Sequence, residues 1–319
     1  MIDMTVLVNQ IIQLFIIICL GYLLFKIGIL NETVNKHINS LILNVSLPFM
    51  IISSVLSLTE HPEKSIIITL FAVSIGFYII MPAIAFIVVK ILRKTIRIHA
   101  NRQGAYMFML IFSNIAFMGI PILQAACGEQ GATAVFYIAV LNIFFSLASF
   151  TYGVILIGYG NEVKTSLKLK NLFTPGIICS VLAVVFYVFN IHLPAMIDNV
   201  LGTVGDLTSP LAMLLVGSTL ASMKLGEVFN EWRIYVFCIL KQIVIPILLY
   251  PVFRLIISDD LLFNVMFIEF LMPVANIALI MATEYKLDNK FVSKTIFIST
   301  AMCLLTIPLV MYLCGIIYA

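Results

Sequence analysis

Two stretches of this sequence place polar side chains and a proline inside segments that are otherwise apolar enough to cross a bilayer. The first, FSNIAFMGIPIL, contains Asn114 and Pro121, and the second, FIEFLMPVANIAL, contains Glu269, Pro273 and Asn276. Proline donates no backbone hydrogen bond, so each stretch predicts an interrupted membrane helix. Such interruptions occur at membrane depth where they are buried in protein or line a water-filled cavity, and paired interruptions form the substrate sites of many secondary transporters. The pattern therefore favours a carrier.

The chemistry of these stretches suits an organic anion. Backbone amides at the start of a half-helix carry partial positive charge, which attracts a carboxylate. Asn114 and Asn276 both donate and accept hydrogen bonds, so they either orient a ligand or bond between helices. Gly119 is expected either to let two backbones approach closely where the helices cross or simply to pack against its neighbours. The predicted substrate-binding set is Asn44, Ser46, Asn114, Gly119, Pro121, Pro273 and Asn276.

A carboxylate inside a membrane span is costly and marks a functional site by default. Glu269 is expected to carry a proton or to hold a cation that enters with the substrate; the alternative is an ion pair with Lys241 of the preceding span. Lys241 is near enough to one face to extend its amine to the surface, or else it contacts the substrate. Gln242 beside it is a further candidate for charge balance or for lining the path.

Composition identifies the class of protein that must position these residues. The chain has 319 residues, of which 62% are hydrophobic and 10% are charged, and its mean hydropathy is +1.16. These values indicate an all-α integral membrane protein. Runs of about 20 apolar residues predict spanning helices. Ten such runs are present: Thr5–Phe25, Ile38–Ser57, Ile66–Val89, Gly104–Ala126, Ala132–Ile157, Phe173–Ile191, Val200–Ser222, Ile234–Ile257, Leu261–Ala282 and Phe291–Ile317.

Basic residues predict the orientation. Of the 18 lysines and arginines, 15 fall in the odd-numbered connections: Lys26, Lys36, Lys90, Arg93, Lys94, Arg97, Arg102, Lys164, Lys168, Lys170, Lys224, Arg233, Lys286, Lys290 and Lys294. Cytoplasmic loops carry such an excess, so both termini are expected outside the plasma membrane. The net charge of +3 therefore needs no nucleic-acid partner to explain it.

The two halves of the chain repeat a pattern of prolines. The matching pairs are Pro48 with Pro210, Pro82 with Pro246, and Pro121 with Pro273. With five spans in each half, the second half enters the membrane in the opposite sense to the first. We therefore expect two inverted five-helix repeats, residues 1–157 and 175–319, joined by a cytoplasmic linker at 158–174. Inverted repeats bring the interrupted fourth and ninth helices together at mid-membrane.

Other functional classes find little support. The six cysteines show no metal-ligand spacing, the four histidines lie in or beside loops, and no span holds a pair of carboxylates. We therefore expect neither enzymatic activity, nor a metal site, nor a cofactor. Membrane lipid is an expected partner, and the apolar first and sixth spans offer a face for a homodimer.

Four segments resemble the recurring motifs of the auxin efflux carrier family in its short bacterial branch: LNVSLPFMI (43–51), SNIAFMGIPIL (113–123), TSPLAMLLVGSTLA (208–221) and MPVANIALIMATEY (272–285). The resemblance implies a ten-helix, five-plus-five fold with crossing broken helices four and nine, which is shared with bile-acid symporters and sodium/proton antiporters. It also implies transport of organic anions: auxin in plants, and malate or malonate in bacterial relatives.

The expected function is thus a permease that moves small organic anions by alternating access. The alternative is a sodium- or proton-coupled symporter or antiporter of the related fold. The position of Glu269 resembles that of an acidic residue used for sodium in bile-acid symporters, whereas auxin carriers are similar in fold but work without sodium. Coupling therefore stays open at this point.

Overall fold

The computed structural model describes residues 4–58, 65–161, 173–222 and 229–317, and this part of the chain is helical without any named strand. Six of its helices are long and apolar enough to cross a membrane: Glu32–Leu56, Ser65–Thr95, Gly128–Ile157, Ala195–Ser222, Trp232–Ile256 and Asn289–Ile317. Shorter apolar helices cover Ile12–Lys26, Ile115–Gln124 and Pro175–Phe189. The chain is therefore an all-helical, multi-pass membrane protein.

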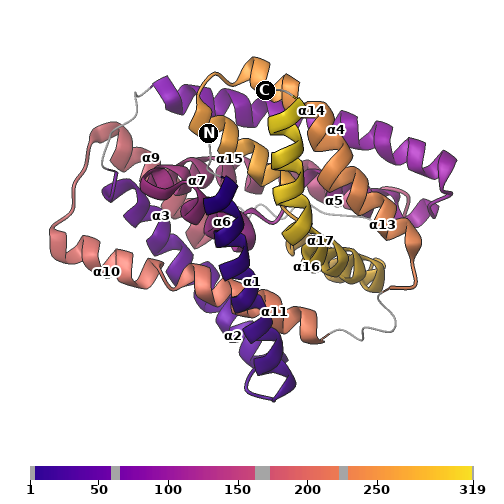
Figure 1. Ribbon diagram of the computed structural model, residues 1–319, viewed down its shortest axis with the longest axis horizontal. Coiled ribbons are helices and arrows are strands. Elements are labelled where there is room, and N and C mark those ends of the chain that lie inside the picture. The colour runs from indigo at the N-terminus through magenta and orange to yellow at the C-terminus, as the bar shows by residue number, and fades with distance from the viewer. Residues whose placement is uncertain (1–3, 59–64, 162–172, 223–228, 318–319) are drawn as a thin grey trace.

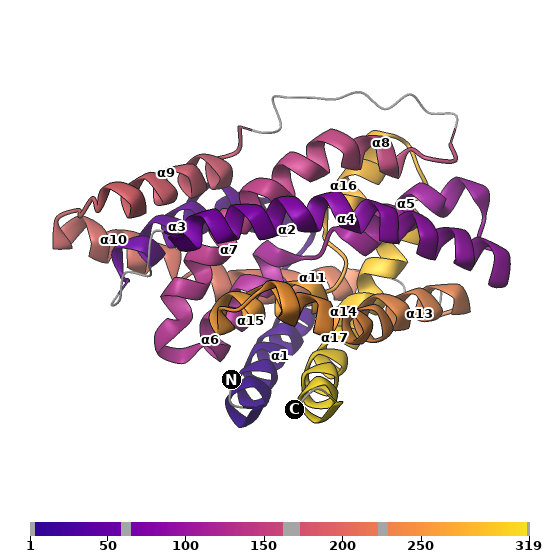
Figure 2. The same cartoon turned by 90° about the horizontal axis from the view of Figure 1, so that it is seen from above.

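The helices follow one another along the chain as Figures 1 and 2 show. The first half contains α1 (Met4–Lys26), α2 (Glu32–Leu41), α3 (Leu47–Leu56), α4 (Ser65–Thr95), α5 (Gln103–Ile111), α6 (Ile120–Ala126), α7 (Gly131–Ala148) and α8 (Val154–Ile157). The second contains α9 (Pro175–Phe189), α10 (Ala195–Gly205), α11 (Thr208–Ser222), α13 (Trp232–Ile239), α14 (Ile245–Ile256), α15 (Asp260–Leu271), α16 (Ile277–Glu284) and α17 (Asn289–Ile317). The outer ends of α1 and α17 lie at one edge in Figure 2, and α8 lies at the opposite edge.

Three prolines are each preceded by a five-residue π-helical turn. The turns are Ile42–Ser46 before Pro48, Ile115–Gly119 before Pro121, and Leu240–Val244 before Pro246. In each case the proline then stands in the first turn of the next α-helical segment, and the helix runs without a break from the π-helical turn through the proline. Single π-helical turns inside helices frequently mark functional sites. All three turns contain candidate site residues: Asn44 and Ser46 in the first, Gly119 in the second, and Lys241 and Gln242 in the third.

Two helical segments are interrupted, and the interruptions lie against each other. Helix α5 ends at Ile111 and helical structure resumes at Ile115, while α15 ends at Leu271 and α16 begins at Ile277. Ser113 and Val274 form an isolated antiparallel bridge between them. The Ala275 N–H donates to the Phe112 carbonyl at 3.1 Å. Backbone groups freed in one segment are thus satisfied by the other, as burial away from water requires.

The first interruption lies earlier than proline alone would place it. The helix stops at Phe112, whose backbone is extended, and Pro121 follows only after the π-helical turn. Helical structure runs from Ile115 through Pro121 to Gln124, so this proline does not itself end the helix. Pro273, in contrast, lies within the second interruption.

The helices can be described as two units, which also contact each other through α7 on α3 and α9 and through α6 on α1. We call α1–α3 with α9–α11 the scaffold unit, because α1 packs along α11 and α3 packs on α9 and α10. We call α4–α8 with α13–α17 the core unit, because α5 packs on α4, α8 and α16, and α17 packs on α13 and α16. Glycines allow the tightest contacts inside each unit: a Cβ on Gly217 would meet the Ile18 backbone, and one on Gly104 would meet the Leu156 carbonyl.

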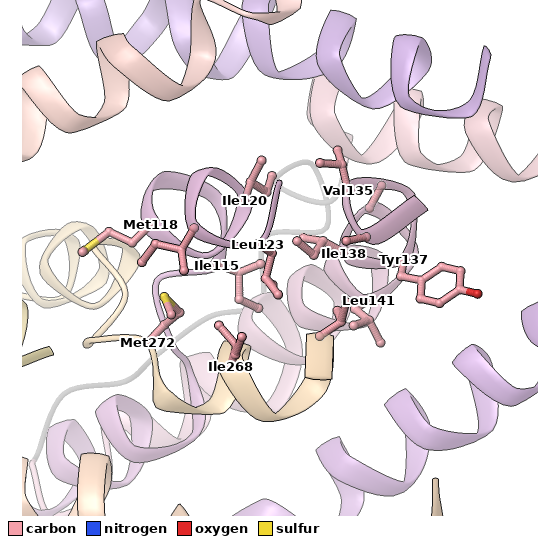
Figure 3. Packing of buried hydrophobic residues seen from close by; sticks show 14 of the residues in the cluster. Ile115, Met118, Ile120, Leu123, Val135, Tyr137, Ile138, Leu141, Ile268 and Met272 are labelled. Carbon is pink, nitrogen blue, oxygen red and sulfur yellow. The ribbon is translucent and has the colours of Figure 1, made fainter. Parts of the chain in front are cut away.

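Apolar packing holds the interrupted segments in place. Figure 3 shows Ile268 and Met272 from the end of α15 facing Ile115 and Leu123 of the other segment. All four side chains are buried within one continuous hydrophobic cluster. The position of one interruption relative to the other is therefore set by close packing as well as by hydrogen bonds.

Candidate functional site

A cavity of about 550 Å³ lies at the paired interruptions. This volume falls within the range of small-molecule sites. Its polar lining residues are Asn39, Asn44, Ser113, Asn114, Asn142, Ser146, Thr174, Asn276, Glu284 and Tyr285. The lining comes from α2, α3 and α9 of the scaffold unit and from α7, α8, α16 and both interruptions of the core unit, so the cavity lies between the units.

The cavity runs from the protein interior to its surface. Asn114 at its inner end is only 4% exposed. Asn44, Ile280 and Glu284 also line it, and all three are exposed. A solute can therefore reach the interrupted helices from one side of the molecule.

Three helix starts border this cavity. Helical structure begins at Ile115 after Asn114, at Ile277 after Asn276, and at Pro175 after Thr174, and all three starts are in the lining. The first N–H groups of a helix have no intrahelical partner and carry partial positive charge. At α9, Pro175 has no N–H and the Ile177 N–H bonds Thr174 Oγ1 at 3.3 Å. The starts at Ile115 and Ile277 are therefore the ones that suit a negatively charged group.

The predicted substrate-binding residues divide into two groups. Asn44, Asn114 and Asn276 line the cavity, whereas Ser46, Gly119, Pro121 and Pro273 do not. Ser46 is buried, and its hydroxyl has no hydrogen-bond partner among the described residues. Pro273 acts through its backbone, because its carbonyl accepts the Asn114 N–H at 2.8 Å.

The expected close backbone approach at Gly119 is wrong. A Cβ at this position would lie 3.6 Å from Met272 Cγ, which is an ordinary van der Waals contact. Ser113 and Val274, instead, join the two backbones by a bridge. The nearest atoms to a Cβ at Gly119 belong to the side chains of Met272 and Ile115. The contact between the two segments therefore does not depend on a glycine at this position.

The expected extension of Lys241 to the membrane surface is also wrong. Its side chain is 0% exposed, and Nζ donates hydrogen bonds of 2.9 Å to Ser113 Oγ and 2.9 Å to the Met272 carbonyl. Two internal acceptors compensate the loss of water around the amine. No ion pair joins Lys241 to Glu269 in the described residues, so the predicted pair is not formed either.

Glu269 occupies a separate small cavity behind the interruptions. This cavity measures about 20 Å³, and Ser74, Tyr78 and Ser113 are among its polar lining residues. Glu269 is 6% exposed, and its Oε1 has no hydrogen-bond partner among the described residues. A space of this size holds about one water molecule or one small ion. The carboxylate is thus placed to bind something that protein groups do not supply.

Gln242 lies next to this region but lines neither cavity. Its Nε2 donates to the Ser299 carbonyl at 2.8 Å, while its Oε1 has no partner among the described residues. The Ser299 hydroxyl accepts the Val274 N–H at 3.2 Å. Gln242 therefore supports the second interruption through α17 rather than facing the solute path.

Sequence reasoning missed seven of the ten polar lining residues, and Ser113, Asn142 and Asn39 show why. Ser113 stands beside Asn114 in the same apolar stretch, and Asn142 is an amide in the middle of the predicted fifth span. Both carry the signal used for Asn114, a polar side chain at membrane depth. Asn39 lies in the amphipathic start of its helix, where a polar residue is ordinary, so nothing in its sequence context marks it.

Comparison with known proteins identifies the family. A family model described as membrane transport protein matches residues 6–163 and 160–311. An uncharacterized transporter of Methanocaldococcus jannaschii is 27% identical over 300 residues, which cover 92% of this chain and 94% of the relative. An uncharacterized transporter of Methanothermobacter thermautotrophicus is 24% identical over 309 residues, covering 94% and 96%. The predicted resemblance is confirmed: this chain belongs to the membrane transport protein family, which is the auxin efflux carrier family.

Proposed function

We propose that this transporter is a secondary carrier of small organic anions, in particular small carboxylates. The observation that carries the proposal is the cavity at the paired interruptions, where the helix starts at Ile115 and Ile277 and the side chains of Asn114, Asn142 and Asn276 supply hydrogen-bond donors. No lysine or arginine is among its lining residues, all of which lie in the described part of the chain. Backbone amides and neutral amides bind a carboxylate without the strong retention that a direct ion pair would cause.

The proposed architecture is ten spanning helices in two inverted five-helix repeats, residues 1–157 and 175–319 with a linker at 158–174. The antiparallel direction of the Ser113–Val274 bridge supports this proposal, because fourth spans of inverted repeats run in opposite senses. Part of the linker, 162–172, lies outside the described residues.

Alternating access would then be a movement of the core unit against the scaffold unit. The cavity lies between the two units, and the glycine contacts at Gly217 and Gly104 are each internal to one unit. The far side of the boundary is closed by contacts that include a hydrogen bond of 3.3 Å from Ser209 Oγ of α11 to Gln124 Oε1 of α6. Rigid-body movement of one packed unit against another is an established mode of such transitions.

We further propose a plasma-membrane location with both termini outside. The mouth of the cavity is lined by Asn39, Thr174 and Glu284, which lie close in sequence to the basic odd-numbered connections. In this orientation the structure is open to the cytoplasm. Exposed apolar side chains such as Ile16 and Leu23 of α1 and Phe189 of α9 suit contact with lipid or with a second copy in a homodimer.

A proton-coupled carrier is the second candidate, and the unpartnered Oε1 of buried Glu269 favours it. Moving one charge across 100 mV is worth ~2.3 kcal/mol, so an interior-negative potential holds a monoanion about fortyfold lower inside. Export needs no coupling, whereas uptake against this bias needs a cation. The same carboxylate would hold sodium in a sodium-coupled symporter or antiporter.

The test is flux of labelled malate or malonate into proteoliposomes containing the purified protein, with an imposed potential. We expect entry that is accelerated by an interior-positive potential, that saturates, and that is competed by other small carboxylates. Protein-free vesicles are the control. A parallel thermal-melting screen of carboxylates should find ligands that raise the melting temperature, because binding to the folded state stabilises it. The proposal fails if no carboxylate is moved and none stabilises the protein.

A further inference from the structure

Ser113 forms part of the wall between two cavities. Among the described residues, Ser113 and Ile115 line both the large cavity of about 550 Å³ and the small cavity of about 20 Å³ that contains Glu269. The Ser113 backbone is held by the bridge to Val274, so the side chain has a defined place at the junction of the two interruptions. Ser113 is 5% exposed, and a polar group this deeply buried requires hydrogen-bond partners.

Lys241 determines which way the Ser113 hydroxyl faces. Its Nζ donates to Ser113 Oγ at 2.9 Å and to the Met272 carbonyl at 2.9 Å. A lysine ammonium has three donors and no acceptor, so the serine oxygen must accept from it. The hydroxyl proton of Ser113 is then left to donate elsewhere. A hydroxyl that accepts a hydrogen bond is polarised and donates more strongly.

The surroundings of Lys241 keep it in this position. Met272 follows directly after the end of α15, where helix carbonyls without intrahelical partners carry partial negative charge. The amine bonds one of these carbonyls and so is attached to the second interruption, while Ser113 belongs to the first. One lysine thus joins both interruptions and places a positive charge one hydroxyl away from the large cavity.

We propose that Ser113 is a substrate-binding residue whose hydroxyl donates to a carboxylate oxygen of the carried anion, and that Lys241 is the positioning residue that imposes this donation. The proposal rests on the proposed function, because it names the group that recognises the anion in the same cavity. The carboxylate meets a polarised hydroxyl with the ammonium behind it. The anion gains from the positive charge without a direct ion pair, and this arrangement favours both binding and release.

The small cavity supplies the competing arrangement. If the Ser113 hydroxyl donates to Glu269 instead, the serine belongs to the carboxylate behind the site and not to the substrate. In that arrangement, loss of the hydroxyl leaves anion affinity unchanged. The two arrangements therefore predict different anion affinities for a protein without the Ser113 hydroxyl, and binding measurements give this affinity directly.

The experiment is a double-mutant cycle on the full-length protein in proteoliposomes, with malonate and malate as probes. Ser113→Ala and Lys241→Met are each expected to weaken the apparent affinity about tenfold, because each removes the directed hydrogen bond to a charged group. The double variant should be no weaker than the worse single variant, since both changes delete the same interaction. Ser113→Thr, which keeps the hydroxyl, should stay within about twofold of the unchanged protein.

Ser180→Ala is the matched control. Ser180 is also a fully buried serine on a membrane helix, but its hydroxyl bonds the Gly176 carbonyl of its own helix and it lines neither cavity. The affinity of the Ser180→Ala variant for malonate and malate should not change. Melting temperatures of all variants identify any that fail to fold, and if Lys241→Met is one of them, the comparison of Ser113→Ala with Ser113→Thr decides.

The inference is overturned by normal affinity in Ser113→Ala, by equal losses in Ser113→Ala and Ser113→Thr, or by losses that add in the double variant. These results are distinct from a failure of the proposed function. Absence of carboxylate transport by the unmodified protein rejects the proposed function itself. Transport by the unmodified protein together with normal affinity in Ser113→Ala rejects only the role of this hydroxyl.

Discussion

The backbone N–H of Asn114 donates a hydrogen bond of 2.8 Å to the carbonyl of Pro273, across the two interrupted helices. The two residues are far apart in the sequence, yet each completes the hydrogen bonding of the other's segment. Pro273 lies between α15 and α16, so its carbonyl is available to the other segment, and the interruption at Asn114 leaves an amide available. Because these backbone groups satisfy each other, the side chain of Asn114 is free to line the cavity.

Replacing Asn114 or Asn276 by alanine should weaken carboxylate affinity about tenfold, because each change removes a side-chain donor to a charged group. The backbone bond between Asn114 and Pro273 survives the substitution, so the melting temperature should change little. Flux measured over a range of malate concentrations gives the affinity. Asn199→Ala on the exposed face of α10 is the control. Normal affinity in both variants would move the site away from the interruptions.

Replacing Glu269 by glutamine should remove any pH or sodium dependence of anion flux while leaving the protein folded. The amide keeps the size of the side chain but can neither take up a proton nor hold a cation in the small cavity. Flux in proteoliposomes at several pH values, with sodium exchanged for an inert organic cation, checks this. Ion dependence that persists unchanged in the glutamine variant would contradict a coupling role.

Replacing Gly217 by alanine should destabilise the scaffold unit by about 2–4 kcal/mol. Any Cβ at this position meets the Ile18 carbonyl and the Tyr22 amide of α1, which are backbone atoms and cannot move aside. Gly76→Ala is the matched control, because a Cβ there meets nothing within 4 Å. Melting temperatures in detergent compare the two. Equal melting of both variants would show that α1 and α11 do not depend on this close contact.

Replacing Arg102 by leucine should lower stability by about 1–3 kcal/mol. Its guanidinium bonds both Glu231 and Asp288, the latter at 2.7 Å, and stacks on the ring of Phe291 at 4.6 Å. The substitution leaves two partly buried carboxylates without this partner at the starts of α13 and α17. The stability of Arg102→Lys should lie between that of the unchanged protein and that of Arg102→Leu, because lysine keeps the charge but lacks the planar guanidinium group. Melting in low and high salt measures the effect, and no change in either variant would contradict it.

One argument from the sequence was enough to predict several residues of the candidate site. A polar side chain inside an apolar span is costly, so Asn114, Asn276 and Glu269 are conspicuous, and each is found lining a cavity. The same argument applied to Ser113 and Asn142 would have found them as well. The position of the first interruption was less accessible, because Pro121 is tolerated where it stands and the helix stops at Phe112 for reasons of pairing with the other half.

The sequence by itself determined that this protein lies in a membrane, that it is helical, and which transporter family it belongs to, because hydropathy and motifs are properties of the chain read in order. Only the tertiary structure decided what Lys241 bonds. Hydropathy sets the depth of a residue in the membrane but not the direction in which its side chain points, and the partner hydroxyl on Ser113 lies 128 residues away along the chain. The direction of the Lys241 side chain and its hydrogen-bond partner follow from how the helices pack, and a hydropathy pattern along the sequence contains no information on that packing.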